Sequence, residues 1–180
     1  SLRRQIGLIF QDYNLVERSP VLTNVLMGRL GYTGTLRSLL GVFSADDVAL
    51  AHRCIERVGL TDKLYQRAGE LSGGQKQRVS IARALTQQPL VILADEPVAS
   101  LDPPTAHEIM SYFRRINEEE GVTIVMNLHD INLAAGYGKR IVGMRDGRIV
   151  HDSGIDKIDA ETFTQIYGRR PYMAELEVTR

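Results

Sequence analysis

Leu90-Val91-Ile92-Leu93-Ala94-Asp95-Glu96 is the stretch of sequence that decides the fold. An apolar run that ends at once in two carboxylates predicts a short strand buried on both faces of a parallel sheet. In such sheets, ligands bind beyond the carboxyl ends of the strands. Asp95 and Glu96 can therefore divide the work there, one holding Mg²⁺ and the other aligning water. A lone Asp-Glu pair would more often only solvate the strand end.

The residues that follow continue an α/β pattern. Asp102 is placed to cap a helix that Gly121 ends, and residues 122–128 form a second apolar strand. His129 comes directly after this strand, so we expect it on the same sheet edge as Asp95. A lone histidine at such a place is more often a helix cap or a loop residue. A short helix from Asp130 and a β-hairpin turning at residues 145–148 complete the pattern.

Upstream, the chain is mostly helical. Residues 6–10 predict a strand that ends in a polar turn beginning at Gln11. As a neutral side chain on the same sheet edge, Gln11 could contact Mg²⁺ or a water without adding charge. Residues 20–31 have helical spacing, and Ser44 is placed to cap a helix that Gly59 ends. Residues 32–43 fit either a loop or a frayed helix.

Leu71-Ser72-Gly73-Gly74-Gln75 opens another predicted helix. A glycine pair lets the backbone lie close to a ligand, and the first turn of a helix offers unpaired amides that suit a phosphate. Ser72 and Gln75 also fit a capping box, which any helix may use. The pentapeptide alone favours neither interpretation.

The composition is that of an ordinary globular chain. Of 180 residues, 43% are hydrophobic and 24% charged, and the net charge is zero, with +5 in residues 1–90 and −5 in residues 91–180. No basic run argues for a nucleic acid partner. The single cysteine, Cys54, excludes an internal disulfide. No apolar run approaches the length of a membrane span, and no secretory signal is visible.

Taken in order, these segments resemble the ABC ATPase superfamily. The positions that carry the resemblance are Gln11 (Q-loop), Leu71 to Gln75 (LSGGQ signature), Leu90 to Glu96 (Walker B strand and its glutamate), Ser100-Leu101-Asp102 (D-loop) and His129 (switch histidine). Five motifs in this order and spacing make coincidence remote.

The resemblance implies a P-loop NTPase (RecA-like) α/β fold with a parallel-sheet core and a helical ABC signature subdomain, truncated at its N-terminus. Residues 1–11 would end a core strand and hold the Q-loop, residues 12–88 would form the helical subdomain, residues 89–168 the RecA-like core, and residues 169–180 a C-terminal tail.

The resemblance also implies a role for each motif residue, with ATP and Mg²⁺ as cofactors. Asp95 and Gln11 would belong to the Mg²⁺ shell, Glu96 would act as general base or orient water, and His129 would contact the γ-phosphate. In this family two subunits sandwich ATP head to tail. The residues that would face the nucleotide of the second copy are Ser72, Gly73, Gly74, Gln75 and Asp102.

Four further stretches resemble the ATP-binding subunits of phosphonate importers: residues 6–16, 22–31, 125–133 and 163–168. This resemblance implies an ATPase that drives uptake of a phosphonate or related phosphorus oxyanion. Its partners would be transmembrane permease subunits and, indirectly, a periplasmic or surface solute-binding protein, with no nucleic acid. It would lie on the cytoplasmic face of the bacterial inner membrane. A groove beside Gln11 and residues 20–31 would receive a short helix of the membrane subunit.

One family feature is absent from the sequence. No G-x-x-x-x-G-K-[ST] motif occurs, and Gly138-Lys139 lies in no glycine-rich loop. The chain also opens at Ser1 without an initiator methionine, which resembles a cut edge. We therefore expect these 180 residues alone neither to bind ATP tightly nor to hydrolyse it.

Three alternatives differ from a phosphonate importer. The first is an ABC importer ATPase for another solute. The second is a soluble ABC-type ATPase of repair, chromosome maintenance or translation. Repair and chromosome types insert long coiled coils between the Q-loop and the signature, but here only 59 residues separate Gln11 from Leu71 and they hold no sustained heptads. Translation types carry two cassettes, and this alternative stays open. The third is a non-catalytic regulatory subunit, against which the presence of both Glu96 and His129 argues.

Overall fold

The computed structural model describes residues 2–154 and 160–169. The predicted tail, residues 169–180, therefore lies outside the described residues except for Arg169. Two compact units divide the chain, Ser1–Asn127 and Leu128–Arg180, and each is described by itself. The proposed boundary between a helical subdomain and a core at residues 88 and 89 stays a prediction.

The elements of the first unit are, in chain order, η1 (Leu2–Gln5), β1 (Ile6–Ile9), α1 (Val21–Leu26), η2 (Met27–Arg29), α2 (Thr35–Leu39), α3 (Ala45–Arg57), η3 (Thr61–Lys63), η4 (Ala68–Glu70), α4 (Gly73–Thr86), β2 (Val91–Ala94), α5 (Pro103–Glu120) and β3 (Thr123–Met126). The elements of the second unit are α6 (Ile131–Tyr137), β4 (Arg140–Arg145), β5 (Arg148–Gly154) and α7 (Ala160–Tyr167). Both predicted core strands and the strand before Gln11 are therefore confirmed.

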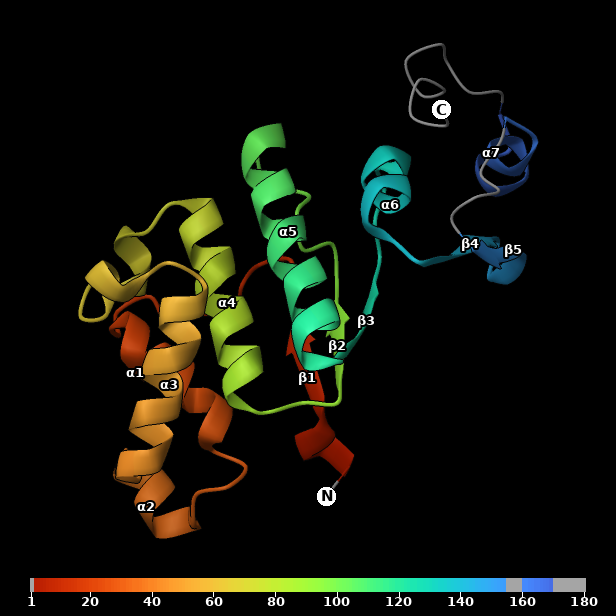
Figure 1. Ribbon diagram of the computed structural model, residues 1–180. Helices are drawn as coiled ribbons and strands as arrows, with labels where there is room; N and C mark the ends of the chain where they lie inside the picture. The colour runs from red at the N-terminus through yellow and green to blue at the C-terminus, as the bar shows by residue number, and fades with distance from the viewer. Residues whose placement is uncertain (1, 155–159, 170–180) are drawn as a thin grey trace. The chain divides into compact units, whose positions relative to one another are not determined.

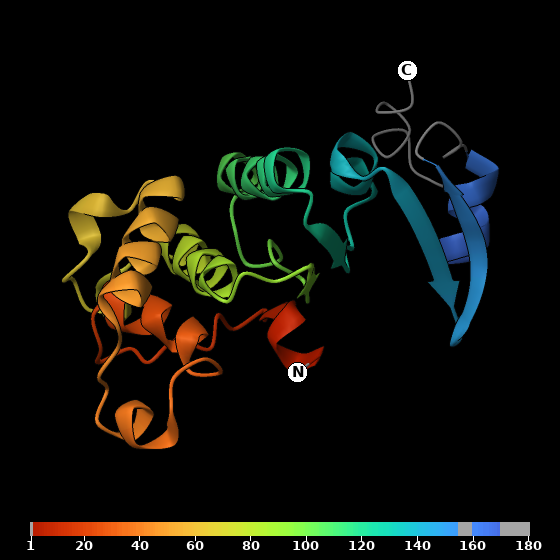
Figure 2. The same cartoon turned by 60° about the horizontal axis from the view of Figure 1, so that its bottom comes forward.

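The three strands of the first unit form one parallel sheet in the order β1-β2-β3. Helices α4 and α5 lie side by side, with α4 packed on β1 and α5 on β3 (Figures 1 and 2). The residues that face these helices are small or apolar, as Gly7, Ile92 and Ile124 are in one cross-strand row. A side chain at position 7 would meet Pro89, Ile92 and Ala84, so the glycine lets α4 approach β1 closely.

The prediction that the core strands are buried on both faces is wrong for the described residues. Leu8, Leu93 and Val125 are paired across the three strands, yet 48%, 39% and 56% of their surfaces are exposed. The reason is that helices of residues 2–127 cover one face of the sheet only. An apolar run cannot reveal this, because the run has the same sequence whether or not its second face is covered.

Helix α3 begins and ends where the sequence predicts. The Ser44 hydroxyl accepts a hydrogen bond from the Asp47 amide at 3.1 Å at the start of α3. Gly59 follows the end of α3 in the left-handed conformation, with a φ of +65°. The predicted helix at residues 20–31 divides into α1 and η2. Within residues 32–43 only the five-residue α2 is helical, and its Leu36 and Leu39 are 72% and 83% exposed.

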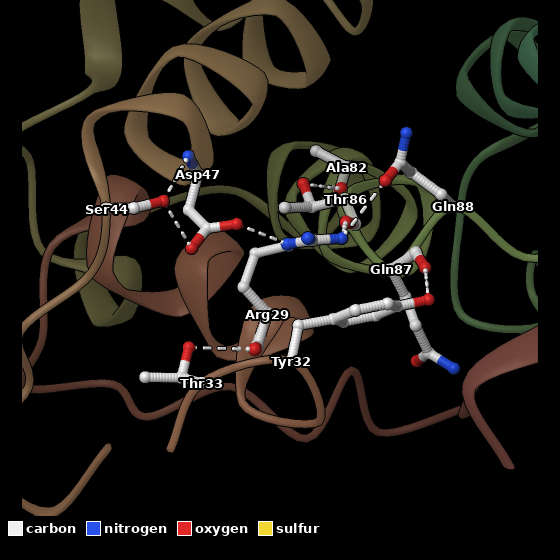
Figure 3. Close-up of polar contacts among 9 residues, drawn as sticks. All are labelled: Arg29, Tyr32, Thr33, Ser44, Asp47, Ala82, Thr86, Gln87 and Gln88. Atoms are coloured by element: carbon white, nitrogen blue, oxygen red, sulfur yellow. Dashed lines mark hydrogen bonds and ion pairs between the residues drawn. The ribbon is translucent and has the colours of Figure 1, made fainter. Parts of the chain in front are cut away.

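The Arg29 side chain connects the end of η2 with the start of α3 and the end of α4. The Arg29 guanidinium donates to Asp47 Oδ1 at 2.6 Å, to the Thr86 carbonyl at 3.3 Å and to Gln88 Oε1 at 3.1 Å (Figure 3). It also stacks over the Tyr32 ring, 3.9 Å from its centre.

Just beyond α4, the side-chain amide of Gln87 donates to the backbone carbonyls of Arg3, Arg4 and Ile6 at 2.9, 3.1 and 2.8 Å. The end of α4 thus holds the start of β1.

In the second unit, β4 and β5 form the predicted antiparallel hairpin. Its turn residues Asp146 and Gly147 both have positive φ, 49° and 74°, which is the geometry that favours an Asp-Gly pair in tight hairpins. Asp130 caps α6, as expected, by accepting hydrogen bonds from the amides of Asn132 and Leu133.

Candidate functional site

The sheet brings Gln11, Asp95 and Asn127 to one edge. The Asp95 amide donates to the Ile9 carbonyl at 2.9 Å, and the Asn127 amide donates to the Ala94 carbonyl at 3.1 Å. The three strands therefore end level with one another, and the residues after them emerge together. Gln11 lies in the predicted turn, residues 11–14, which we call the Gln11 turn, and its side chain is exposed.

Asp95 is held from one side. Its Oδ1 accepts a hydrogen bond from the Asn127 side-chain amide at 2.5 Å, and the Asp95 side chain is exposed. A hydrogen bond to a carboxylate oxygen is charge-assisted and fixes the orientation of the group. Oδ2 of Asp95 has no hydrogen-bond partner within the described ranges, so this oxygen is available to a ligand.

Glu96 is half-buried and has an unusual backbone. Its φ of 44° lies in the left-handed region, which few side chains other than glycine and asparagine adopt readily. Such conformations occur at functional sites when the surrounding structure enforces them. The sharp bend separates Glu96 from the line of the strand and lets it point differently from Asp95.

The edge fits a magnesium ion that is held mainly by a bound phosphate compound. Mg²⁺ typically takes one or two protein carboxylates and keeps waters or phosphate oxygens for its other positions. Asp95 offers one oriented carboxylate with a free oxygen. Within residues 2–154 and 160–169, no three His, Cys, Asp or Glu side chains gather closely enough to hold a metal by themselves.

The signature turn, which we define as residues 72–75, forms a complete capping box. The Gln75 amide donates to Ser72 Oγ at 3.3 Å, and the Ser72 amide donates to Gln75 Oε1 at 3.0 Å. The structural interpretation of Ser72 and Gln75 is therefore confirmed. Gly73 and Gly74 are half-buried at the start of α4, where the backbone amides point out of the helix.

Both glycines of the signature turn are also packed against neighbouring loops. A side chain at Gly73 would come within 3.1 Å of the Tyr13 hydroxyl and 3.4 Å of Leu101. A side chain at Gly74 would come within 2.4 Å of the Thr105 methyl group. Close packing thus disfavours a side chain at Gly74, and less strongly at Gly73, whether or not a phosphate binds, and it brings the Gln11 turn and the start of α5 to the signature turn.

Asp102 is the N-cap of α5, and both its carboxylate oxygens are occupied. Oδ1 accepts from the Thr105 amide at 3.1 Å, and Oδ2 accepts from the Thr105 hydroxyl at 2.7 Å. The hydrogen bond from the Thr105 side chain, followed by that from its amide, lowers the pKa of Asp102. Since Thr105 also touches Gly74, Asp102 and the signature turn are neighbours through one residue.

His129 belongs to the second unit, so its predicted place beside Asp95 stays a prediction. Its side chain is exposed, and its carbonyl accepts a hydrogen bond from the Tyr167 hydroxyl at 3.1 Å. The capping of α6 is done by the next residue, Asp130. His129 is therefore a loop residue, and the helix-cap alternative does not apply to its side chain.

A pocket of about 590 Å³ lies beside β1 and the Gln11 turn. Its lining includes Phe10, Asn14, Met27, Gly28 and Arg83. This is the region in which the resemblance to importers implies a groove beside Gln11 and residues 20–31.

Three residues of this region are not evident as site residues from the sequence: Asn127, Arg83 and Thr105. A signal existed for Asn127, because it is the one amide side chain in the apolar run of residues 122–128 and lies near the carboxyl end of that run. Thr105 and Arg83 carry no comparable signal, since their partners Gly74, Tyr13 and Asn14 are far away in the sequence.

A parallel sheet with an oriented carboxylate at its edge, in a chain that also has a glycine pair at a helix start, agrees with the class of nucleotide-binding cassettes that the sequence motifs predict. The family model described as ABC transporter matches residues 1–99, and the chain belongs to the ABC transporter family.

Several of its relatives are phosphonate import proteins. The chain is 57% identical over 169 residues to the phosphonates import ATP-binding protein PhnC 3 of Halalkalibacterium halodurans, covering 94% of this chain and 66% of that protein. It is 56% identical over 168 residues to PhnC 1 of Oceanobacillus iheyensis, covering 93% and 65%. It is 52% identical over 175 residues to PhnC of Bacillus cereus, covering 97% and 68%. The chain thus spans about two thirds of the length of these relatives.

Solved structures confirm the expected fold. An inward-facing metal-chelate type ABC transporter has a TM-score of 0.84 at 23% identity, over 92% of this chain and 64% of that one. A dimeric ATP-binding cassette in a post-hydrolysis state, bound to ADP and Pi, has a TM-score of 0.70 at 36% identity, over 85% of this chain and 64% of that one. No described helix is long and apolar enough to cross a membrane.

Proposed function

We propose that the protein is the ATP-binding and ATP-hydrolysing subunit of an ABC importer, and that its solute is a phosphonate or a related phosphorus oxyanion. The observation that carries the proposal is the level sheet edge, where Asp95 is oriented by Asn127 and keeps one carboxylate oxygen for a ligand. The relatives named above, which are phosphonates import ATP-binding proteins, support the choice of solute.

Each predicted site residue has a task in this proposal. Mg-ATP supplies a γ-phosphate whose charge the ion helps to neutralise. Asp95 would hold the ion, and Gln11, from the neighbouring strand end, would contact the ion or the attacking water. Glu96 would orient that water and accept its proton, and His129 would contact the γ-phosphate.

The remaining residues face a second copy of the subunit. In a head-to-tail dimer, the start of α4 would present Ser72, Gly73, Gly74 and Gln75 to the ATP held by that copy. Asp102 would lie beside them, because Thr105 joins it to Gly74. The dimeric cassette bound to ADP and Pi supports the pairing of two copies.

The pocket beside the Gln11 turn is our candidate for the contact with a permease subunit at the cytoplasmic face of the inner membrane. It is open, largely apolar and adjacent to Gln11, so a short partner helix there could sense the state of the site. A solute-binding protein would act on the permease and not on this chain.

Hydrolysis is tested by replacing Glu96 in the natural protein that contains this chain. Glu96→Gln should lower kcat for Mg-ATP at least about a hundred-fold while ATP binding persists, because the water loses its base and Asp95 is untouched. Glu118→Gln, an exposed carboxylate on α5, serves as the matched control and should hydrolyse ATP as the parent does. Equal turnover in the Glu96→Gln variant and its parent would refute the role.

The transport proposal needs a separate measurement. Met27→Glu places a charge in the pocket and should abolish phosphonate uptake by the assembled importer while ATP turnover of the subunit stays near that of the parent. A charge reversal at the exposed Glu17, near the same turn, would test the contact less cleanly, since Glu17→Lys also removes the 3.1 Å ion pair of Glu17 with Lys76. Normal uptake with Met27→Glu would place the permease contact elsewhere, and uptake of other solutes alone would identify the importer as one of a different solute class.

A further inference from the structure

The Gln11 turn contains two adjacent residues in the left-handed region. The φ angles of Tyr13 and Asn14 are 60° and 47°. Asparagine adopts this conformation readily, but for tyrosine it is unfavourable unless neighbouring groups enforce it. The turn therefore needs an external support to keep this shape.

Arg83 on α4 provides that support. Its Nη2 donates to the Tyr13 carbonyl at 2.7 Å, and its Nη1 donates to the Asn14 carbonyl at 2.5 Å. The planar guanidinium is suited to this task because its N–H groups form a rigid fork that reaches two acceptors at once. A lysine in its place would carry the same charge on a single nitrogen, without two separate donors held in a fixed plane. Nη2 of Arg83 also lies 3.5 Å from Ser80 Oγ, which keeps the side chain along its own helix.

The same turn reaches the other end of α4. The Tyr13 hydroxyl lies so close to Gly73 that a side chain at that position would come within 3.1 Å of it. A few residues further on, Glu17 accepts from Lys76 Nζ at 3.1 Å, and its carbonyl accepts from the Gly69 amide at 2.9 Å. Residues 11–17 are thus attached along α4 from its first turn to its last.

We infer that Arg83 and Tyr13 fasten the Gln11 turn to α4, so that Gln11 and the signature turn move as one body. Arg83 acts through the backbone of the turn and is a positioning residue. The fastening itself stands on the contacts above. Its catalytic consequence rests on the proposed function, in which Gln11 serves the ATP of one copy and the signature turn serves the ATP of the other.

Amide hydrogen exchange in the natural protein tests the fastening without any need for activity. Arg83→Gln should speed exchange of the amides of residues 13–17 at least about ten-fold, the equivalent of one charge-assisted hydrogen bond, and leave α3 unchanged. Arg83→Lys should give a smaller increase. Tyr13→Ala changes only the exposed turn and its contact with Gly73, so it should speed exchange there even if Arg83→Gln fails to fold.

Arg78→Gln is the matched control. Arg78 lies on the same helix and also donates to a backbone carbonyl, that of Val58 at 3.3 Å, but it does not touch the Gln11 turn. It should leave exchange of residues 13–17 at the parental rate. If Arg83→Gln and Tyr13→Ala change that rate no more than Arg78→Gln does, the turn is not fastened to α4.

Turnover of Mg-ATP tests the catalytic consequence. Arg83→Gln should lower kcat about ten-fold and leave KM for ATP near the parental value, because the turn is misplaced while the nucleotide grip is not. An unchanged kcat together with faster exchange would mean that the fastening has no catalytic role. A parent without Mg-ATP turnover would refute the proposed function, and the exchange rates would still decide the fastening.

Discussion

At the scale of single residues, two buried amide side chains make a natural comparison. Asn24 and Gln77 are both fully buried. The Asn24 side chain accepts from the Val16 amide at 2.7 Å and donates to the carbonyls of Val16, Ser19 and Pro20. Neither Oε1 nor Nε2 of Gln77 has a hydrogen-bond partner among the residues that the structure describes.

We predict that Gln77→Leu leaves the free energy of unfolding unchanged or raises it, because it removes two buried polar atoms without partners. Asn24→Leu should lower the free energy of unfolding by about 3 kcal/mol, because the substitution leaves several backbone groups that now bond to Asn24 without a hydrogen-bond partner. Urea titration of both variants and the parent measures the difference. A large loss of stability from Gln77→Leu would show that a water or another group binds to this amide.

Residues next to a strand end could be predicted from the sequence, and residues that meet across the fold could not. Asp95 and Gln11 follow apolar runs directly, and the sheet does bring them to one edge. Asn127 meets Asp95 only because β2 and β3 are paired in the register that places Ala94 beside Met126. The sequence of neither strand alone predicts this register.

At the scale of elements, the contact between α4 and α5 depends on one missing side chain. We predict that Gly74→Ala lowers the free energy of unfolding by about 1–3 kcal/mol, because its methyl group would lie 2.4 Å from Thr105 Cγ2. Thermal unfolding followed by circular dichroism measures the loss.

The partner residue provides the control for this clash. Thr105→Ser removes the methyl group but keeps the hydroxyl that Asp102 accepts from. The double variant with Gly74→Ala and Thr105→Ser should therefore recover most of the lost stability. If the double variant is no more stable than Gly74→Ala, the glycine is needed for its backbone and not for this contact.

Helix ends were the most predictable part of the fold. Ser44, Ser72 and Asp102 each accept a hydrogen bond from the amide three residues on, which is a local relation that the sequence displays directly. The exposed second face of the sheet was not predictable, because burial depends on what packs above a strand. Residues 32–43 were ambiguous because most of their apolar side chains face solvent, so no periodic stripe marks a helix.

At the scale of the whole molecule, the contacts of Asp47 in Figure 3 make the free energy of unfolding depend on pH. Burial, the largest single influence, would raise the pKa of Asp47, but hydrogen bonds from Ser44 and Arg29 and the charge of Arg29 together lower it below its ordinary value of 3.8. In the folded protein Asp47 thus releases its proton at lower pH than in the unfolded chain. Its contribution to stability is complete above pH 3.8 and disappears as the pH falls through the lowered value.

We predict that Asp47→Asn makes the free energy of unfolding less dependent on pH below 3.8 and lowers it at neutral pH, where the ion pair with Arg29 is lost. Urea titrations between pH 2 and 7 measure both effects. Asp62→Asn, at an exposed carboxylate 3.5 Å from Lys63, is the control and should behave as the parent does. Parallel pH profiles for Asp47→Asn and the parent would contradict the assignment.

The position of α4 has a consequence for how the chain can vary in length. Its first turn touches the Gln11 turn and α5, and the residue just after its last turn, Gln87, holds the start of β1. One inserted residue would rotate everything beyond it by about 100° and separate these partners. Residues 32–43 hold no comparable set of partners at both ends. The exposed α2 region should therefore tolerate inserted tags, reporter domains or natural insertions. An insertion in α4 should not be tolerated, because its fourteen residues fix the spacing between these partners.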